Sequence, residues 1–171
     1  RLVFEGARVP RDARLGDGER DGEAALHRAH LRGMAALAAE IVGGAEATLV
    51  LTRDYAIARK QFGKQIGAFQ GVKYPIVDTM IGVELARSHA IAAAAAVDQG
   101  PDAAETAVRM AKALASEVFP LAVRRGVQLH GGYGFTWDCD VHFYFKRALW
   151  SRATLGDGAH HRAHLARALL G

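Results

Sequence analysis

Two glycine-rich segments carry the residues whose types are suited to binding a ligand. The first, residues 59–70, combines a cation (Arg59) with a polar–aromatic pair (Gln61 and Phe62) and places Gln70 where the next apolar segment opens. A guanidinium, an aromatic face and the free N–H groups of a helix N-terminus together suit a ligand that carries both phosphate and an aromatic ring. This segment is therefore the first candidate site.

The second segment is Gln128-Leu129-His130-Gly131-Gly132-Tyr133-Gly134. Glycine at 131, 132 and 134 allows the backbone to approach a ligand closely, and the amide of Gln128 can hydrogen-bond to another amide or to a pyrophosphate. Two ordinary helix-terminating turns would have a similar composition. Spacing alone leaves both interpretations open.

The rest of the chain predicts long helices that position these segments. Apolar residues recur at three- and four-residue steps, which predicts helices over 23–58, 69–98 and 102–130 and a fourth helical region over 141–170. The sum is an all-α fold, an antiparallel four-helix bundle over 23–171. In an up-and-down bundle the connections after the first and third helices lie at the same end. The two glycine-rich segments can therefore converge, either within one subunit or across a subunit interface.

Several residues predict irregularities within these helices. Pro75 places the start of the second helix between Phe69 and Tyr74, and Pro120 predicts a kink in the third helix. The fourth region has a possible break at 156–158. Gly43-Gly44 in the first helix indicates either a close helix crossing or a ligand beside the backbone.

Residues 1–22 lack this periodicity. Leu2, Val3 and Phe4 are typical of one short strand, which has no partner here, and the segment carries no initiator Met. We interpret residues 1–22 as the remnant of a preceding β domain and a linker, cut from a longer chain.

Composition excludes several classes of protein. Half of the 171 residues are apolar, and the net charge is +4. The Lys and Arg residues are dispersed along the chain, which argues against nucleic-acid binding. An unbroken apolar run of about 20 residues is absent, so no membrane span is expected. The single Cys139 excludes an internal disulfide and favours a reducing, cytoplasmic location.

Other catalytic and metal motifs are incomplete. His160 and His164 share a helix face, as zinc ligands do, but no Glu follows the first His and no third ligand stands out, so no metal is expected. Cys139 has no CxxC partner and no activating base, and a serine nucleophile elbow is absent.

The pattern Arg59-x-Gln61-Phe62-Gly63-Lys64-x-Ile66-Gly67-x-Phe69-Gln70, followed by Gln128–Gly134, resembles the acyl-CoA dehydrogenase family. Nearly the whole chain takes part in the resemblance. Residues 1–20 are similar to the end of the family's middle β domain, and residues 23–170 to its C-terminal four-helix domain.

The resemblance implies an FAD enzyme whose cofactor lies across a subunit interface, with the ADP end held by the helical domain of a neighbouring subunit. It places Arg59 at the pyrophosphate, Gln61 beside it and Phe62 on the adenosine. The adenine and pyrophosphate side would be closed by Gln70, Gln128 and the backbone of Gly131 and Gly132.

The same resemblance implies the reaction and the partners. The family oxidises an acyl-CoA to the trans-2-enoyl-CoA, in fatty acid or lipid degradation, and an electron-transfer flavoprotein accepts the electrons. A homo- or hetero-oligomer, arranged as a dimer of dimers, is expected.

The catalytic glutamate of the family has no counterpart in this sequence. Its usual position, twenty residues after Phe135, is Leu155, and the family arginine seven residues further on falls on Arg162. Leucine cannot accept a proton. The next carboxylate, Asp157, is one candidate for a replacement base, and Glu40 is the other. Asp157 also replaces a threonine that helps to bind flavin in the family.

A second branch of the family carries its base on the first helix, twenty-six residues before the motif arginine, which is Gly33 here. Glu40 lies seven residues later on a similar face of the helix. Two hypotheses follow: an acyl-CoA dehydrogenase polypeptide that is active or contributes to activity, and a non-catalytic structural subunit of a heteromeric acyl-CoA dehydrogenase that builds the oligomer core.

Overall fold

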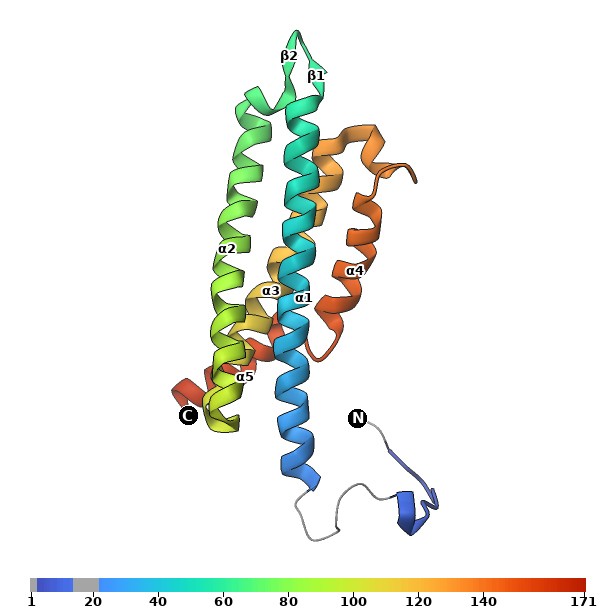
Figure 1. Ribbon diagram of the computed structural model, residues 1–171, viewed down its shortest axis with the longest axis vertical. Helices are drawn as coiled ribbons and strands as arrows, with labels where there is room; N and C mark the ends of the chain where they lie inside the picture. The colour runs from blue at the N-terminus through green and yellow to red at the C-terminus, as the bar shows by residue number, and fades with distance from the viewer. Residues whose placement is uncertain (1–2, 14–21) are drawn as a thin grey trace.

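The computed structural model describes residues 3–13 and 22–171, in which four helices pack together (Figure 1). These helices are α1 (Gly22–Ala58), α2 (Gln70–Gln99), α3 (Pro101–His130) and α4 (Val141–Ala153). α3 packs against the other three, α1 also packs against α2 and α4, and successive helices run in opposite directions. The predicted all-α four-helix fold is confirmed.

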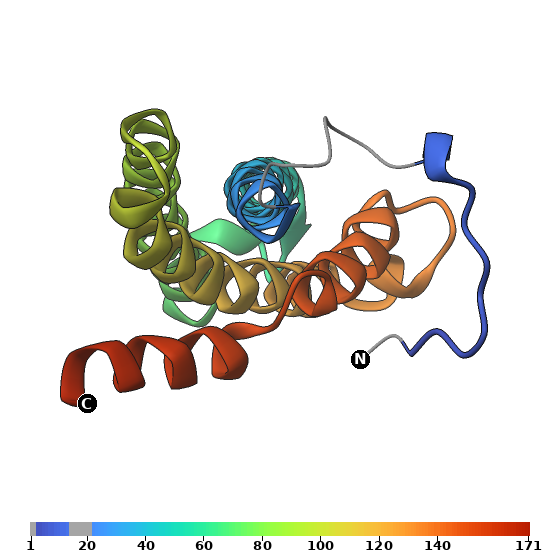
Figure 2. The same ribbon diagram turned by 90° about the horizontal axis from the view of Figure 1, so that it is seen from below.

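A fifth helix, α5 (Gly158–Leu170), packs against α3 and lies across the bundle at the end far from the α1–α2 connection (Figure 2). The predicted fourth helical region is therefore two helices, and the break lies at the predicted glycines. α3 continues through Pro120 without ending there, and α2 begins at Gln70, within the interval that Pro75 indicated.

The α1–α2 connection is a small hairpin. β1 (Lys60–Gln61) pairs antiparallel with β2 (Lys64–Gln65), and the short 3-10 helix η2 (Ile66–Ala68) leads into α2. Phe62 and Gly63 form the tip with φ of +52° and +80°, the left-handed conformation that two-residue hairpin turns require at both central positions. The hairpin projects beyond the end of the bundle (Figure 1).

The core contains many small residues, which let the helices approach closely. A Cβ placed on Gly44 would lie 2.7 Å from Cε1 of Phe119 on α3, whereas a Cβ on Gly43 would meet nothing within 4 Å. The close-crossing interpretation therefore holds for Gly44. Gly43 points away from that crossing.

The N-terminal segment differs from its prediction where it is described. Val3 and Phe4 lie outside any strand and are exposed, and Leu2 lies outside the described residues. A short 3-10 helix, η1 (Arg11–Ala13), is the regular element among residues 3–13. The interpretation of residues 1–22 as a domain remnant stays a prediction.

By length and composition alone, α1 and α2 are each long and apolar enough to cross a membrane. Core helices of soluble proteins meet the same criterion, and both helices pack in the bundle described above. The expectation of no membrane span therefore stays an expectation.

Candidate functional site

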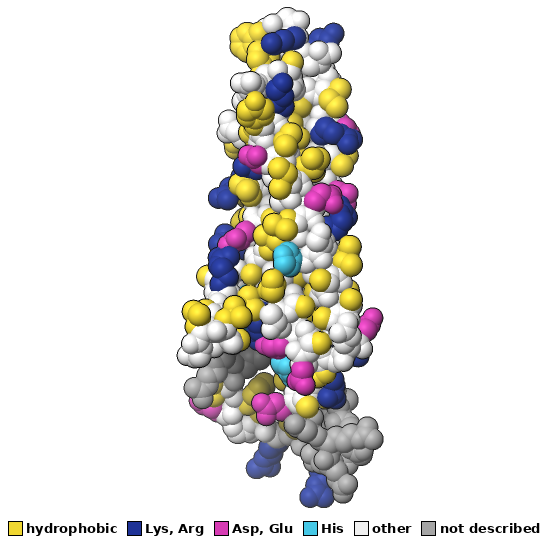
Figure 3. Space-filling model, turned by 90° about the vertical axis from the view of Figure 1, so that its left-hand side faces the viewer, with side chains coloured by type: hydrophobic (Ala, Val, Ile, Leu, Met, Phe, Trp, Pro, Cys, Tyr) yellow, Lys and Arg dark blue, Asp and Glu magenta, His cyan; other side chains and the backbone are white. Residues whose placement is uncertain are grey.

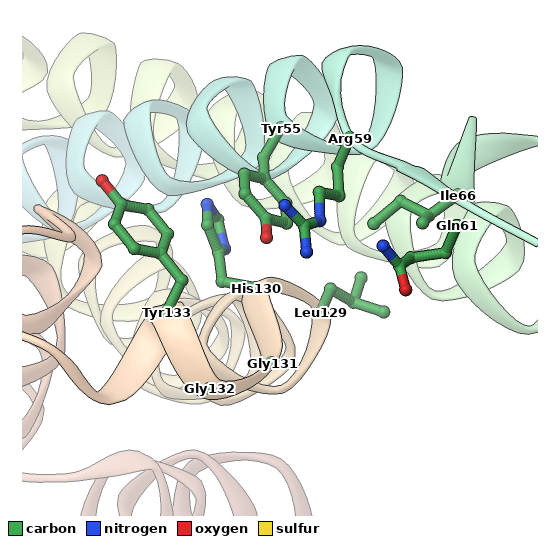
Figure 4. A pocket seen from close by; sticks show the side chains of 9 residues that line it. All are labelled: Tyr55, Arg59, Gln61, Ile66, Leu129, His130, Gly131, Gly132 and Tyr133. Carbon is green, nitrogen blue, oxygen red and sulfur yellow. The ribbon is translucent and has the colours of Figure 1, made fainter. Parts of the chain in front are cut away.

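The two glycine-rich segments converge on one cavity, as the up-and-down topology predicts. It has a volume of about 600 Å³ and lies at the hairpin end of the bundle (Figure 4). Its lining comes from the end of α1, the hairpin, η2, the end of α3 and the 3-10 helix η3 (Gly131–Phe135): Tyr55, Arg59, Gln61, Ile66, Leu129, His130, Gly131, Gly132 and Tyr133.

Arg59 supplies the positive charge of this cavity. Its backbone N–H donates to the carbonyl of Tyr55 (2.8 Å) and closes α1, while its carbonyl accepts from the N–H of Ile66 (2.9 Å). Within residues 3–13 and 22–171 its guanidinium has no hydrogen-bond or salt-bridge partner. The backbone is thus fixed at both ends while the guanidinium remains available to an anion.

Aromatic rings form one wall of the cavity. Tyr55 stacks on His130 (centroids 4.4 Å apart, 27° between planes) and lies nearly parallel to Tyr133 (5.8 Å, 13°). Nδ1 of His130 donates to the carbonyl of Gly126 (2.8 Å), because a carbonyl can only accept. The wall is therefore a fixed apolar face.

The phenol of Tyr133 is also held in place. It donates to the carbonyl of Asp138 (2.7 Å), and burial, followed by the nearby Cys139 and Asp138, raises the pKa of Tyr133. The hydroxyl therefore stays protonated and keeps donating at neutral pH.

Gly131 and Gly132, between His130 and Tyr133, leave part of the lining without side chains. Gly131 has φ of +62°, and a Cβ placed on either glycine would meet nothing within 4 Å. Backbone atoms are thus exposed to the cavity at the C-terminus of α3. A ligand can approach them without displacing a side chain.

Leu155 lies far from this cavity, in the turn between α4 and α5. It has φ of +59°, and its Cδ1 lies 3.5 Å from where a Cβ would stand on Gly33 of α1. The positions of the two family bases are thus adjacent in space, and neither carries a carboxylate.

The two nearby carboxylates have other roles. Asp157 caps α5 by accepting from the backbone N–H of His160 (2.9 Å), and this hydrogen bond lowers the pKa of Asp157. Glu40 accepts two hydrogen bonds from Arg147 of α4 (2.7 and 2.8 Å).

Residues 23–170 match the protein family described as acyl-CoA dehydrogenase, C-terminal domain. The chain belongs to the acyl-CoA dehydrogenase family. Similar proteins include the acyl-CoA dehydrogenase IpdE2 of Mycobacterium tuberculosis, 46% identical over 112 residues that make up 66% of this chain and 33% of IpdE2. CarC of Acetobacterium woodii, a subunit of a caffeyl-CoA reductase–Etf complex, is 34% identical over 78% of this chain and 35% of its own length.

A solved structure of PigA with FAD and proline aligns with 86% of this chain and 38% of PigA, with a TM-score of 0.81 and 32% identity. The chain spans about a third of the length of the two curated relatives named above. What the comparison covers is therefore the helical domain of an acyl-CoA dehydrogenase.

The cavity includes four of the seven residues that the resemblance predicts to bind FAD: Arg59, Gln61, Gly131 and Gly132. The other three, Phe62, Gln70 and Gln128, do not line it. Phe62 is 92% exposed at the hairpin tip, with its ring edge-on to Phe69 (6.1 Å). The role of all seven residues stays a prediction.

Sequence reasoning missed the aromatic wall. His130 and Tyr133 belong to the motif that carries the resemblance, but only the glycines and Gln128 received a role there. Tyr55 lies four residues before Arg59, so the helical repeat places both on one face of α1. That spacing was a usable signal.

The histidines at the start of α5 lie close together without forming a cluster of metal ligands. The rings of His160 and His164 are 4.7 Å apart, and among the described residues no group of three His, Cys, Asp or Glu is arranged to hold an ion.

Proposed function

We propose that this chain supplies the ADP-side half of an FAD site to a neighbouring subunit of an acyl-CoA dehydrogenase, and that the catalytic base lies outside this chain. The observation that carries the first part is the cavity that Arg59, whose guanidinium has no partner among the described residues, lines together with the open backbone of Gly131 and Gly132. Membership of the acyl-CoA dehydrogenase family supports the choice of cofactor.

The chemistry of the cavity fits this group. A pyrophosphate needs a cation and hydrogen-bond donors, which Arg59 and the amide of Gln61 provide. The rings of Tyr55 and Tyr133 offer a flat apolar face of the kind that an adenine stacks on. When bound, FAD would supply the oxidising power of the reaction, while these residues bind and orient its ADP portion.

The second part of the proposal, that the base lies outside this chain, rests on the positions and partners of the carboxylates near Leu155. Leu155 and Gly33 occupy both family base positions, Asp157 is engaged as a helix cap, and Glu40 is paired with Arg147. A general base has to be free to accept a proton at the reacting carbon. The α-proton of the acyl-CoA would therefore be removed by a residue outside this chain.

The partners of the whole protein follow from its relatives. CarC belongs to a complex with an electron-transfer flavoprotein, and we extend such an acceptor to this protein. The substrate class, an acyl-CoA thioester that undergoes α,β-desaturation, is extended on the same basis of family membership.

The test is flavin affinity in the full-length, assembled protein. Arg59→Gln is expected to raise the Kd for FAD about 10- to 100-fold, because it removes a charge-assisted contact to phosphate. Arg124→Gln is the matched control, since Arg124 is also exposed but lies outside the cavity. Equal affinity in the Arg59 and Arg124 variants would contradict the proposal.

A structural role in the oligomer core is the second candidate, and one surface favours it. Large apolar side chains are exposed along α2 (Figure 3): Tyr74, Val77, Ile81, Leu85 and Ile91. A purely structural subunit predicts that Ile81→Glu dissociates the assembly while Arg59→Gln changes nothing. The FAD proposal predicts a loss of flavin affinity in Arg59→Gln with the assembly intact.

A further inference from the structure

A buried lysine lies beneath the turn that carries Leu155. Lys112 of α3 is 0% exposed, and its Nζ donates to Oγ of Ser116 (2.8 Å), the carbonyl of Arg152 (3.2 Å) and the carbonyl of Gly156 (2.7 Å). Arg152 belongs to the last turn of α4, whose carbonyls lack helical partners. One ammonium group therefore joins α3, the end of α4 and the turn.

The turn needs such an anchor because its backbone is strained. Leu155 has φ of +59° and Gly156 has φ of +95°, so two successive residues are left-handed, and the first is not glycine. This conformation costs a residue with a branched side chain roughly 1 kcal/mol or more. It persists only where surrounding contacts enforce it.

α5 closes the turn from its other side. A Cβ on Gly156 would lie 2.6 Å from Cδ2 of His160 and 3.0 Å from Nε2 of His161, so these two rings lie directly against the glycine. His161 is 0% exposed. The turn is thus confined between the ammonium of Lys112 and two imidazoles.

Lys112, His160 and His161 form a cluster around the turn, and at its centre Lys112 carries the positive charge while His161 is neutral. Burial lowers the pKa of His161 to about 4, with the charge of Lys112 contributing, so His161 is neutral at pH 7. Burial also lowers the pKa of Lys112 to about 8, opposed by Asp157.

The other charged and titratable groups around the cluster come from three elements: Arg109 on α3, Arg152 on α4, and His160 on α5. Of the carboxylates, Asp157 is the one whose charge acts on Lys112, and it lies at the start of α5. The ammonium is therefore held mainly by carbonyl oxygens.

We propose that Lys112 is the positioning residue for side chain 155: its ammonium holds the α4–α5 turn in the left-handed conformation that directs this side chain onto Gly33. The relevance of position 155 to catalysis rests on the proposed function. The anchoring of the turn does not.

The pKa of Lys112 sets how this charge depends on pH. At pH 7 the ammonium keeps its proton, so its hydrogen bonds to the carbonyls of Arg152 and Gly156 are charge-assisted. An opening that returns Lys112 to water restores the higher pKa of an exposed amine, so the open state binds more protons between pH 8 and 10.5 and opening becomes harder as pH rises. The turn is therefore tested at pH 7, where the charge is present.

Amide hydrogen exchange in the full-length assembled protein tests the proposal. The reporters are the N–H groups of Thr154 and Gly156, which donate to Trp150 and Ala153. Exchange is normalised to the intrinsic rate and measured at pH 7, where Lys112 carries its charge. Both reporters are expected to be protected in the wild-type protein, and amides in α2 serve as the internal reference.

Two variants at the same position sharpen the test. Lys112→Arg keeps the charge and is expected to preserve protection of the turn at pH 7. Lys112→Met is expected to lower protection of the turn at least tenfold at pH 7. Lys146→Met is the control, because Lys146 is exposed and lies over the ring of Trp137 (4.4 Å).

Two results would overturn the proposal: unchanged protection of the turn in Lys112→Met, or a uniform rise in exchange over the whole bundle. If Lys112→Met fails to fold, Lys112→Gln, which also removes the charge, takes its place. Because neither substrate nor turnover is involved, a failure here is distinguishable from a failure of the FAD proposal.

Discussion

The side chain of Leu155 packs against Gly33 of α1: its Cδ1 lies 3.5 Å from the place where a Cβ on Gly33 would stand. The two residues are 122 positions apart in the sequence, yet the family resemblance assigns a catalytic base to each position in different branches. A base that comes from position 155 in one branch and from position 33 in another has to reach the same reacting carbon, so the two positions have to lie close together. Their proximity supports the alignment of Leu155 with the family glutamate.

If the chain has no base of its own, removing its two nearby carboxylates will leave the reaction intact. Glu40→Gln and Asp157→Asn are expected to retain activity of the assembled protein within about threefold, since asparagine still caps a helix. Loss of a true general base typically costs about 100-fold or more. Steady-state desaturation of an acyl-CoA is the measurement, and a 100-fold loss in either variant would identify the base that we exclude.

A carboxylate at position 155 is expected to restore a base. Leu155→Glu in the full-length protein should raise the rate of α-proton removal at this chain's own site about 100-fold or more over wild type. The side chain in Leu155→Gln has nearly the same shape as the one in Leu155→Glu but lacks a basic carboxylate, so this variant should show no gain in the rate of α-proton removal. Exchange of the α-proton of an acyl-CoA with solvent deuterium is the readout. With flavin bound normally, equal rates in both variants count against the alignment of Leu155.

The glycine pair in α1 predicts opposite effects on stability. Gly44→Ala is expected to lower the free energy of unfolding by about 1–3 kcal/mol, because its methyl group would overlap the ring of Phe119. Gly43→Ala meets no neighbour and is expected to raise it by up to about 1 kcal/mol through helix propensity. Urea unfolding measures both. Destabilisation by Gly43→Ala would mean that its open side is covered in the assembly.

His161 predicts a loss of stability in acid. Its pKa is about 4 in the folded chain and 6.5 in the unfolded chain, so the stabilisation is fully present above pH 6.5 and is lost as pH falls towards 4. The expected loss is on the order of 2 kcal/mol. His161→Gln should flatten the dependence of the unfolding free energy on pH between pH 4 and 6.5. His89→Gln on α2 should leave this dependence unchanged. The same slope in all three proteins would show that His161 titrates normally.

The parts of the fold that follow from local periodicity were predictable. The end of α3 at His130 and the break between α4 and α5 coincide with glycines, and α1 ends at Ala58, where the apolar periodicity stops. The convergence of residues 59–70 with residues 128–134 followed from helix order alone, because alternate connections of an up-and-down bundle share one end.

The parts that depend on tertiary contacts were not predictable. Lys112 lies in an ordinary helical pattern, and nothing in that pattern marks a lysine whose ammonium is satisfied by carbonyls forty or more residues away. The position of Phe62 outside the cavity depends on the left-handed hairpin tip, which a glycine-rich pattern does not specify residue by residue.

The central claim is that the ADP portion of FAD lies at the hairpin end of this bundle. The most direct measurement is photolabelling of the full-length assembled protein with 8-azido-FAD, which reacts from its adenine ring, followed by peptide mapping. The account predicts label in the segment from Tyr55 to Gln61 or from His130 to Tyr133 of this chain. Stoichiometric label confined to peptides outside both segments would contradict it.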